Sequence, residues 1–132
     1  MRNGIHNITV DDIERIKRDA IVTDAHLVEI HGKDIQSWDD YLNKIQVGFL
    51  FPNGRRVNID GYNDWMQDLA WLGAESYVLV IHEYSEFLTH DAGCKEMIME
   101  IFRDLILPWW QADVEKYCAG GKAKPFNVYL VG

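Results

Sequence analysis

The middle of the chain reads Tyr77-Val78-Leu79-Val80-Ile81-His82, a run of five apolar residues followed by one histidine. A strand that is apolar at every position has both faces covered, which is typical of the middle of a parallel sheet. A strand with one face in water would instead alternate apolar and polar residues. The run therefore predicts a central strand with a layer of structure on each side.

Two further segments have the composition of strands. Residues 25–31 contain Leu27, Val28 and Ile30, and residues 126–131 close the chain with apolar residues at every position except Asn127. Helical segments separate the three strands, and this alternation is typical of a small α/β domain. The predicted fold class is therefore α/β, with a three-stranded parallel sheet packed with helices.

The helices are predicted from apolar residues at helical spacing and from capping residues before them. They are expected after Thr9, after Ser37, over residues 63–72 and over residues 94–107. Pro108 is expected to break the last helix, or to open a further helix over residues 109–117, because proline has no backbone N–H.

The negative charge is concentrated in one part of the sequence. The chain has 132 residues and a net charge of −8, and its length predicts one domain. Residues 57–94 contain no lysine or arginine, whereas the other 94 residues hold 14 acids against 13 bases. The seven acids of this stretch are Asp60, Asp64, Asp68, Glu75, Glu83, Glu86 and Asp91. The electric field of this concentrated negative charge attracts a cationic partner. It argues against binding to nucleic acid and to anionic membranes, because both would be repelled.

The helix expected over residues 63–72 has two different faces. The apolar face consists of Trp65, Leu69 and Leu72, with Met66 at its edge. The opposite face consists of Asp64, Gln67, Asp68 and Trp71. This pattern predicts that one face is buried and that the other displays two carboxylates and an indole to solvent.

Four sequence elements occur in one order along most of the chain. They are residues 30–40, with a glycine turn before a helix; residues 61–69; the strand after residue 76; and residues 101–104, followed by the terminal strand. The ordered set resembles the barstar family of small intracellular inhibitors of the secreted ribonuclease barnase. The resemblance covers roughly residues 25–132, so that residues 1–24 are expected to be an N-terminal helical extension.

The resemblance implies that an acidic helix plugs the active site of a ribonuclease. Asp64 and Asp68 match the two helical aspartates of the family, and Gly61 matches the glycine that lets the preceding loop approach the partner. Asp104 is placed like a contacting acid of the family, although an ion pair with a nearby base is the other interpretation.

The chain also departs from the family pattern. Ile59 and Asp60 stand where the family has an aromatic pair, and Gln67 stands where it has an aromatic residue. The match of Asp64 requires one residue fewer after Asn63, and residues 108–124 form a longer connection than the family has.

The physical chemistry of a ribonuclease supports the same interpretation. Its cleft must hold phosphate, so it is lined with lysine and arginine. Carboxylates fixed on a helix can occupy the phosphate positions and accept charge-assisted hydrogen bonds, which are bidentate when the donor is arginine. We therefore expect Asp64 and Asp68 to bind a basic protein, a ribonuclease or a toxin, with Trp71 as an anchor at the edge.

Three alternatives follow from other residues. The first is an adaptor that binds a basic protein through the extension and the region of Trp109 and Trp110. The second is a small hydrolase with Glu83 and Glu86, or Asp64 and Asp68, as an acid–base pair. The third is a metal site built from His82, Glu83, Glu86, His90 and Asp91. A reactive thiolate at Cys94 is a further possibility, with an inert buried thiol as the commoner outcome.

The favoured hypothesis is a non-enzymatic inhibitor of the immunity or antitoxin type. We expect no cofactor, no metal, no direct contact with nucleic acid and no membrane association. Cys94 and Cys118 lack the spacing of a zinc site, and the first residues lack the apolar core of a signal peptide. The expected location is therefore the cytoplasm.

Overall fold

A computed structural model describes residues 2–52 and 58–132 and shows an α/β architecture. The strands are β1 (Gly4–Ile8), β2 (Ala25–His31), β3 (Ser76–His82) and β4 (Phe126–Val131). The α-helices are α1 (Ile13–Val22), α2 (Trp38–Gly48), α3 (Ile59–Met66), α4 (Ala92–Ile101) and α5 (Val114–Tyr117). Within the described residues, no helix is long and apolar enough to cross a membrane.

The sheet is parallel throughout, with the strand order β1-β4-β3-β2. The three predicted strands and the α/β class are confirmed, and β3 lies between two other strands as expected. The sheet has four strands rather than three because β1 pairs with β4. Asn3 fixes the start of β1: its side-chain amide donates to the carbonyls of Leu107 and Lys124, and its oxygen accepts from the backbone N–H of Phe126.

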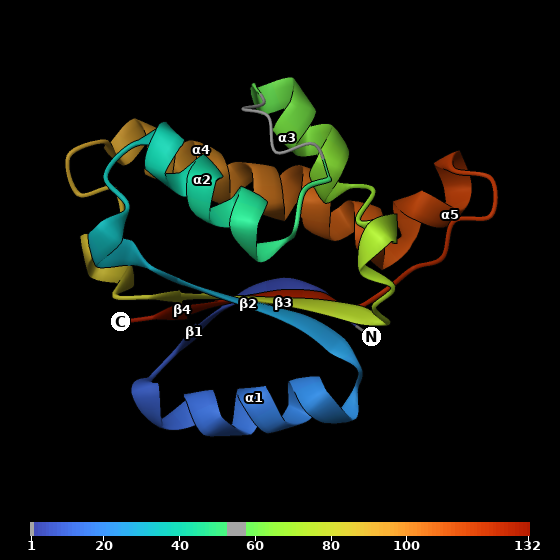
Figure 1. Ribbon diagram of the computed structural model, residues 1–132, viewed down its shortest axis with the longest axis horizontal. Coiled ribbons are helices and arrows are strands. Elements are labelled where there is room, and N and C mark those ends of the chain that lie inside the picture. Colours follow the sequence, from blue (N-terminus) through green and yellow to red (C-terminus); the bar gives the residue numbers. More distant parts are fainter. Residues whose placement is uncertain (1, 53–57) are drawn as a thin grey trace.

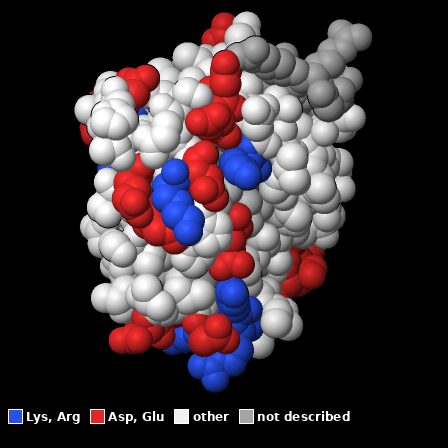
Figure 2. Space-filling view, turned by 60° about the vertical axis from the view of Figure 1, so that its left-hand side comes forward, with Lys and Arg blue, Asp and Glu red and all other residues white. Residues whose placement is uncertain are grey.

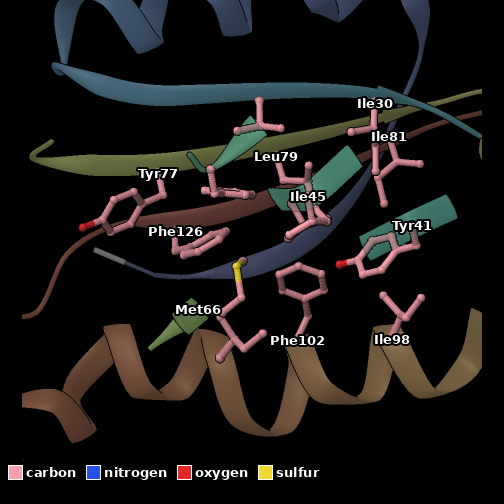
Figure 3. Close-up of a cluster of buried hydrophobic side chains, with 14 of the residues drawn as sticks. Ile30, Tyr41, Ile45, Met66, Tyr77, Leu79, Ile81, Ile98, Phe102 and Phe126 are labelled. Atoms are coloured by element: carbon pink, nitrogen blue, oxygen red, sulfur yellow. The ribbon is translucent and has the colours of Figure 1, made fainter. Parts of the chain in front are cut away.

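Both faces of β3 are covered. Helix α1 lies against one face of the sheet, and α2, α3 and α4 lie on the other side (Figure 1). Tyr77, Leu79 and Ile81 belong to the larger core, whereas Val80 packs with Ile13, Ile16 and Val131 under α1. Figure 3 shows the larger core, with side chains from the sheet, from α2 and from α4 pointing toward one another. The continuous apolar run is thus explained by burial on two sides.

The long C-terminal helical region is not interrupted by Pro108. Helical segments follow one another from α4 to α5, and they include π-helical turns over Phe102–Ile106 and Trp109–Asp113 on either side of the proline. A proline ring clashes with the carbonyl four residues before it, and a wider π turn relieves this clash. The predicted break at Pro108 is therefore wrong, whereas the alternative prediction of helical structure over residues 109–117 is confirmed.

A hydrogen bond between two buried tyrosines connects α2 to α3. The hydroxyl oxygens of Tyr41 and Tyr62 lie 2.6 Å apart, and both residues are fully buried. Burial raises the pKa of both hydroxyls above the ordinary value, so both stay neutral at physiological pH. Each hydroxyl is the polar partner of the other inside an apolar core.

We expect Tyr62→Phe to lower the free energy of unfolding by about 1–3 kcal/mol, because the hydroxyl of Tyr41 loses its partner in a buried site. Urea denaturation measures the effect. The double variant Tyr41→Phe with Tyr62→Phe removes both polar groups and should be closer to the wild type than the single variant. Tyr117→Phe is the control, since Tyr117 is 76% exposed. Equal stability of Tyr62→Phe and wild type would contradict the expectation.

Candidate functional site

The acidic helix begins earlier and ends earlier than the sequence predicted. Helix α3 covers Ile59–Met66, whereas residues 63–72 were expected. It begins after Asn58, whose side-chain oxygen accepts a hydrogen bond from the backbone N–H of Gly61 at 2.8 Å. Asparagine is among the preferred N-cap residues, so this start has an ordinary sequence signal that Gly61 and Asn63 obscured.

The end of α3 is fixed by tertiary contacts. Leu69 adopts a left-handed backbone conformation with φ 53°, and the short 3₁₀ turn Ala70–Leu72 follows it. Leucine is seldom found there, and the reversal places its side chain fully in the core. The indole N–H of Trp110 donates to the carbonyl of Met66 at 2.9 Å, and that of Trp109 donates to the carbonyl of Gln67 at 2.8 Å. Two indoles thereby satisfy carbonyls that the helix itself leaves free.

These bounds change which aspartates share the helix. Asp64 lies in the last turn of α3, and Asp68 lies beyond the end of the helix, where its side chain accepts a hydrogen bond from the backbone N–H of Ala70. The prediction of Asp64 and Asp68 on one helix is therefore wrong. The two aspartates one turn apart on α3 are Asp60 and Asp64, and both are exposed. Asp60 is the residue that the sequence interpretation missed.

Three exposed carboxylates lie along α3 and just beyond its end. Among residues 2–52 and 58–132, no ion pair involves Asp60, Asp64 or Asp68. All three side chains are exposed to solvent. These three negative charges are therefore not neutralised by a direct ion pair with any described residue.

The other residues predicted for the site lie around α3 in different environments. Gly61 is half-buried in the first helical turn. Gln67 is half-buried, and its side-chain amide donates to the carbonyl of Asn63. Trp71 was expected on the exposed face but is half-buried, because its indole donates to the carbonyl of Phe49 at 2.9 Å. Asp104 is exposed on the first π turn, with its carboxylate 3.5 Å from Nε of Arg103.

A groove of about 590 Å³ opens beside the end of α3. The groove is lined by residues of three segments: Asp64, Gln67, Asp68 and Ala70; Trp109, Trp110 and Val114; and residues of the 118–124 segment. Behind it lies Tyr77, which packs on Trp110. Burial raises the pKa of the Tyr77 hydroxyl to about 12, with smaller contributions from the negative charges of Asp68 and Glu75. Asp68 is thus close enough to influence a buried group while remaining exposed itself.

Three residues of the alternative metal and hydrolase sites, His82, Glu83 and Asp91, have other partners. His82 Nε2 lies 3.1 Å from a carboxylate oxygen of Glu29, and the carboxylate of Glu83 lies 3.2 Å from Nδ1 of His31. Asp91 caps α4 by accepting from the N–H of Cys94. No three His, Cys, Asp or Glu side chains of the described part of the chain are arranged to hold a metal ion.

The packing also bears on two other predictions, a reactive thiolate at Cys94 and an adaptor surface at Trp109 and Trp110. Burial and then the charge of Asp91 raise the pKa of the Cys94 thiol, which is the opposite of thiolate activation. Trp110 is buried and Trp109 half-buried, and both indoles donate inward. They hold α3 in place, and of the two tryptophans proposed for an adaptor surface only Trp109 is partly exposed.

Comparison with known families identifies the chain. The model of the family described as barstar (barnase inhibitor) matches residues 25–130, so the chain belongs to the barstar family and the sequence resemblance is confirmed. Comparison with curated proteins gave no match, and neither did comparison with solved structures. The described function of the family is inhibition, which agrees with a protein that acts by binding.

The start of α3 can be tested through its cap. We expect Asn58→Ala to lower the free energy of unfolding by about 1 kcal/mol, because the N–H of Gly61 loses its acceptor. Asn58→Asp keeps a side-chain oxygen at the same place and should retain most of the stability. Urea denaturation of the three proteins measures the difference. Wild-type stability of Asn58→Ala would show that the helix does not begin there.

Proposed function

We propose that the chain is a barstar-like inhibitor of the immunity or antitoxin type, which binds the basic active site of a ribonuclease or toxin. The observation that carries the proposal is that Asp60, Asp64 and Asp68, along and just beyond α3, are exposed and form no ion pair with another described residue. Membership of a family described as barnase inhibitors supports it. Contact through these side chains blocks the positions that RNA phosphates would occupy.

The carboxylates are held rigidly before any partner arrives. On the opposite side of the same segment, Tyr62, Met66 and Leu69 are completely buried. The N-cap of Asn58 and the indole bonds of Trp109 and Trp110 fix the two ends of α3. Side chains on a fixed scaffold lose less conformational entropy on binding, and this preorganisation raises affinity.

Charge explains how the partner is recognised. A cleft that binds phosphate presents arginine and lysine, and these cations form short, strong hydrogen bonds with carboxylates. Close charge pairs that are shielded from water can couple strongly, and removal of one member costs several kcal/mol. The same groups that bind the substrate of the enzyme therefore bind the inhibitor.

The net charge of the protein supports rapid association. The chain carries −8, and acidic side chains cover more of the face shown in Figure 2 than basic ones do. Attraction between an acidic protein and a basic enzyme raises the association rate above that of neutral partners. A cell that makes its own toxic nuclease benefits from such speed.

The remaining predicted residues have supporting places in this proposal. Gly61 keeps the first turn of α3 free of a side chain next to Asp60 and Asp64. Gln67 and Trp71 use their polar groups within the chain, and so they offer the partner their exposed edges. Asp104, which is paired with Arg103, contributes at the periphery.

The proposal includes the place and the organisation of the protein. Residues 25–132 form the inhibitory domain, and residues 1–24 form an extension whose strand β1 completes the sheet. Cys94 and Cys118 are free thiols, as is usual in a reducing compartment. Their state supports a cytoplasmic inhibitor that protects the cell before a ribonuclease is exported.

A double charge reversal, Asp60→Lys with Asp64→Lys, tests the inhibitory face. We expect the wild type to inhibit RNA cleavage by a member of a panel of small basic ribonucleases that includes barnase. The reversal should weaken binding at least about 100-fold, equivalent to about 2.7 kcal/mol, because two attractive charges become repulsive. Isothermal titration calorimetry measures the affinity, and circular dichroism verifies the fold.

The matched control reverses two exposed acids, Asp11→Lys in the turn just before α1 and Glu14→Lys in the first turn of α1. It changes the net charge by the same amount on the other side of the sheet (Figure 1). This variant should lose only the small part of the affinity that arises from long-range attraction. The proposed face would be refuted if inhibition survives the reversal on α3 or falls equally in the control. The proposed function would be refuted if the wild type inhibits none of the ribonucleases in the panel.

A further inference from the structure

We propose that a groove along the edge strand β1 is a second binding site, separate from the face proposed for the ribonuclease, and that it takes an extended peptide ending in a free carboxylate. The groove has a volume of about 640 Å³, which lies within the range of pockets that enclose a ligand. It is bounded by the start of β1 and by the helical region that begins with α4. Among the described residues, none lines both this groove and the groove beside α3.

The N-terminal extension builds one side of the groove. Residues 2–5 line it, and all of them precede residue 25, where the match to the barstar family begins. Asn3 fixes this side to the helical region, because its backbone N–H donates to Oε1 of Gln111 at 2.6 Å and its side-chain amide donates to the carbonyl of Leu107 at 3.3 Å. The groove therefore exists only with residues that lie outside the family match.

Most of the surface inside the groove is apolar. The sheet contributes Ile5 and Leu130, and the helical region contributes Met99, Leu107 and Pro108. Met99, Leu107 and Leu130 are buried in the protein. A ligand with apolar side chains would remove the remaining apolar surface from water, and this burial favours binding.

Strand β1 offers backbone groups to the same ligand. Gly4 and Ile5 line the groove, and β1 is an outer strand of the sheet that pairs only with β4 among the described strands. Alternate N–H and C=O groups of such a strand point away from the sheet. Lysine and proline, which commonly protect an edge from further pairing, are absent from Gly4–Ile8. An extended peptide can therefore add a fifth strand to the sheet.

The charged residues of the groove give the peptide a direction. Arg2 precedes β1, and Arg103 lies one turn before Leu107, which contacts Asn3. Both arginines thus lie toward the end of the groove where β1 begins. Glu96 lines the groove seven residues before Arg103, about 10 Å away along the helix axis.

This separation of charge matches the two ends of a short peptide. Both arginines are exposed; within residues 2–52 and 58–132 Arg2 forms no ion pair, and Arg103 pairs only with the exposed Asp104 beside it. A guanidinium group binds a carboxylate through two parallel hydrogen bonds. Three to four extended residues span about 10–13 Å, so the terminal ammonium reaches Glu96. The peptide therefore runs antiparallel to β1, with its carboxylate where β1 begins.

Titration of the full chain with the tetrapeptide Thr-Val-Thr-Leu, free at both ends, tests the site by ¹H–¹⁵N NMR without any ribonuclease. Its Val and Leu side chains occupy alternate positions and so lie on the same side of an extended chain. We expect saturable shifts of the amides of Gly4, Ile5 and Met99. We also expect at least fivefold slower hydrogen exchange of the outward amides of β1 at saturation, because these amides then donate to the peptide.

Three altered peptides separate the contributions to binding. The peptide with a C-terminal amide lacks the negative charge and should bind at least fivefold more weakly. Thr-Ser-Thr-Ser keeps both charges but lacks the apolar side chains, and should give no saturable shifts. The peptide that is N-methylated along its backbone lacks the donors that pair with β1, and it should also give no saturable shifts.

A charge-neutralised protein identifies the partner of the carboxylate. In Arg2→Gln with Arg103→Gln, the free acid and the amide should bind with the same weakened affinity. Arg15→Gln with Arg18→Gln is the matched control, because it removes two exposed arginines from α1 on the other face of the sheet (Figure 1). This control should bind the free acid as the wild type does.

Three results would overturn the inference: shifts that do not saturate, undiminished binding of the N-methylated peptide, or a preference for the free acid that persists without Arg2 and Arg103. Inhibition of a nuclease enters none of these measurements. The outcome at the groove along β1 is therefore independent of the outcome for the proposed function.

Discussion

A helix of eight residues cannot hold its shape in water, and this constraint governs the functional side of the molecule. Isolated helices shorter than about 12–15 residues are marginal. Helix α3 is stable because Tyr62 and Met66 enter the core and because two indoles bind its last carbonyls. The positions of Asp60 and Asp64 are therefore set by the long helical region beneath α3 and, through it, by the sheet.

The sheet was predictable because its signals are local. A continuous apolar run identified β3, and burial on two faces accounts for it. Strand β4 was recognised because it is apolar at every position except Asn127. Strand β1 escaped detection because Gly4–Ile8 contains only two isoleucines beside glycine, histidine and asparagine. It forms because β4, at the other end of the chain, supplies backbone partners for β1 and the N–H of Phe126 donates to the side chain of Asn3. Long-range pairing of this kind leaves no periodicity in a single sequence.

The presence of an acidic helix could be predicted from the sequence, but the residues at which it begins and ends could not. An acidic stretch and an acidic helix were expected, and both are present. The helix was placed too late, because the capping signal of Asn58 was not considered and the reversal at Leu69 depends on the core. Trp71 illustrates the same difficulty, since a helical wheel cannot show that a carbonyl from another segment will bind the indole.

The arrangement of acids is better explained by binding than by folding. Asp60, near the N-terminus of α3, is favoured by the helix dipole, but Asp64 and Asp68 are at the opposite end, where lysine or arginine would be stabilising. Like charges one turn apart add a repulsion of about 0.2–0.5 kcal/mol. These costs are small beside the several kcal/mol that a charge pair in a dry interface can provide. A chain selected for stability alone would exchange these acids for bases, whereas a chain selected to bind a cation keeps them and accepts the loss.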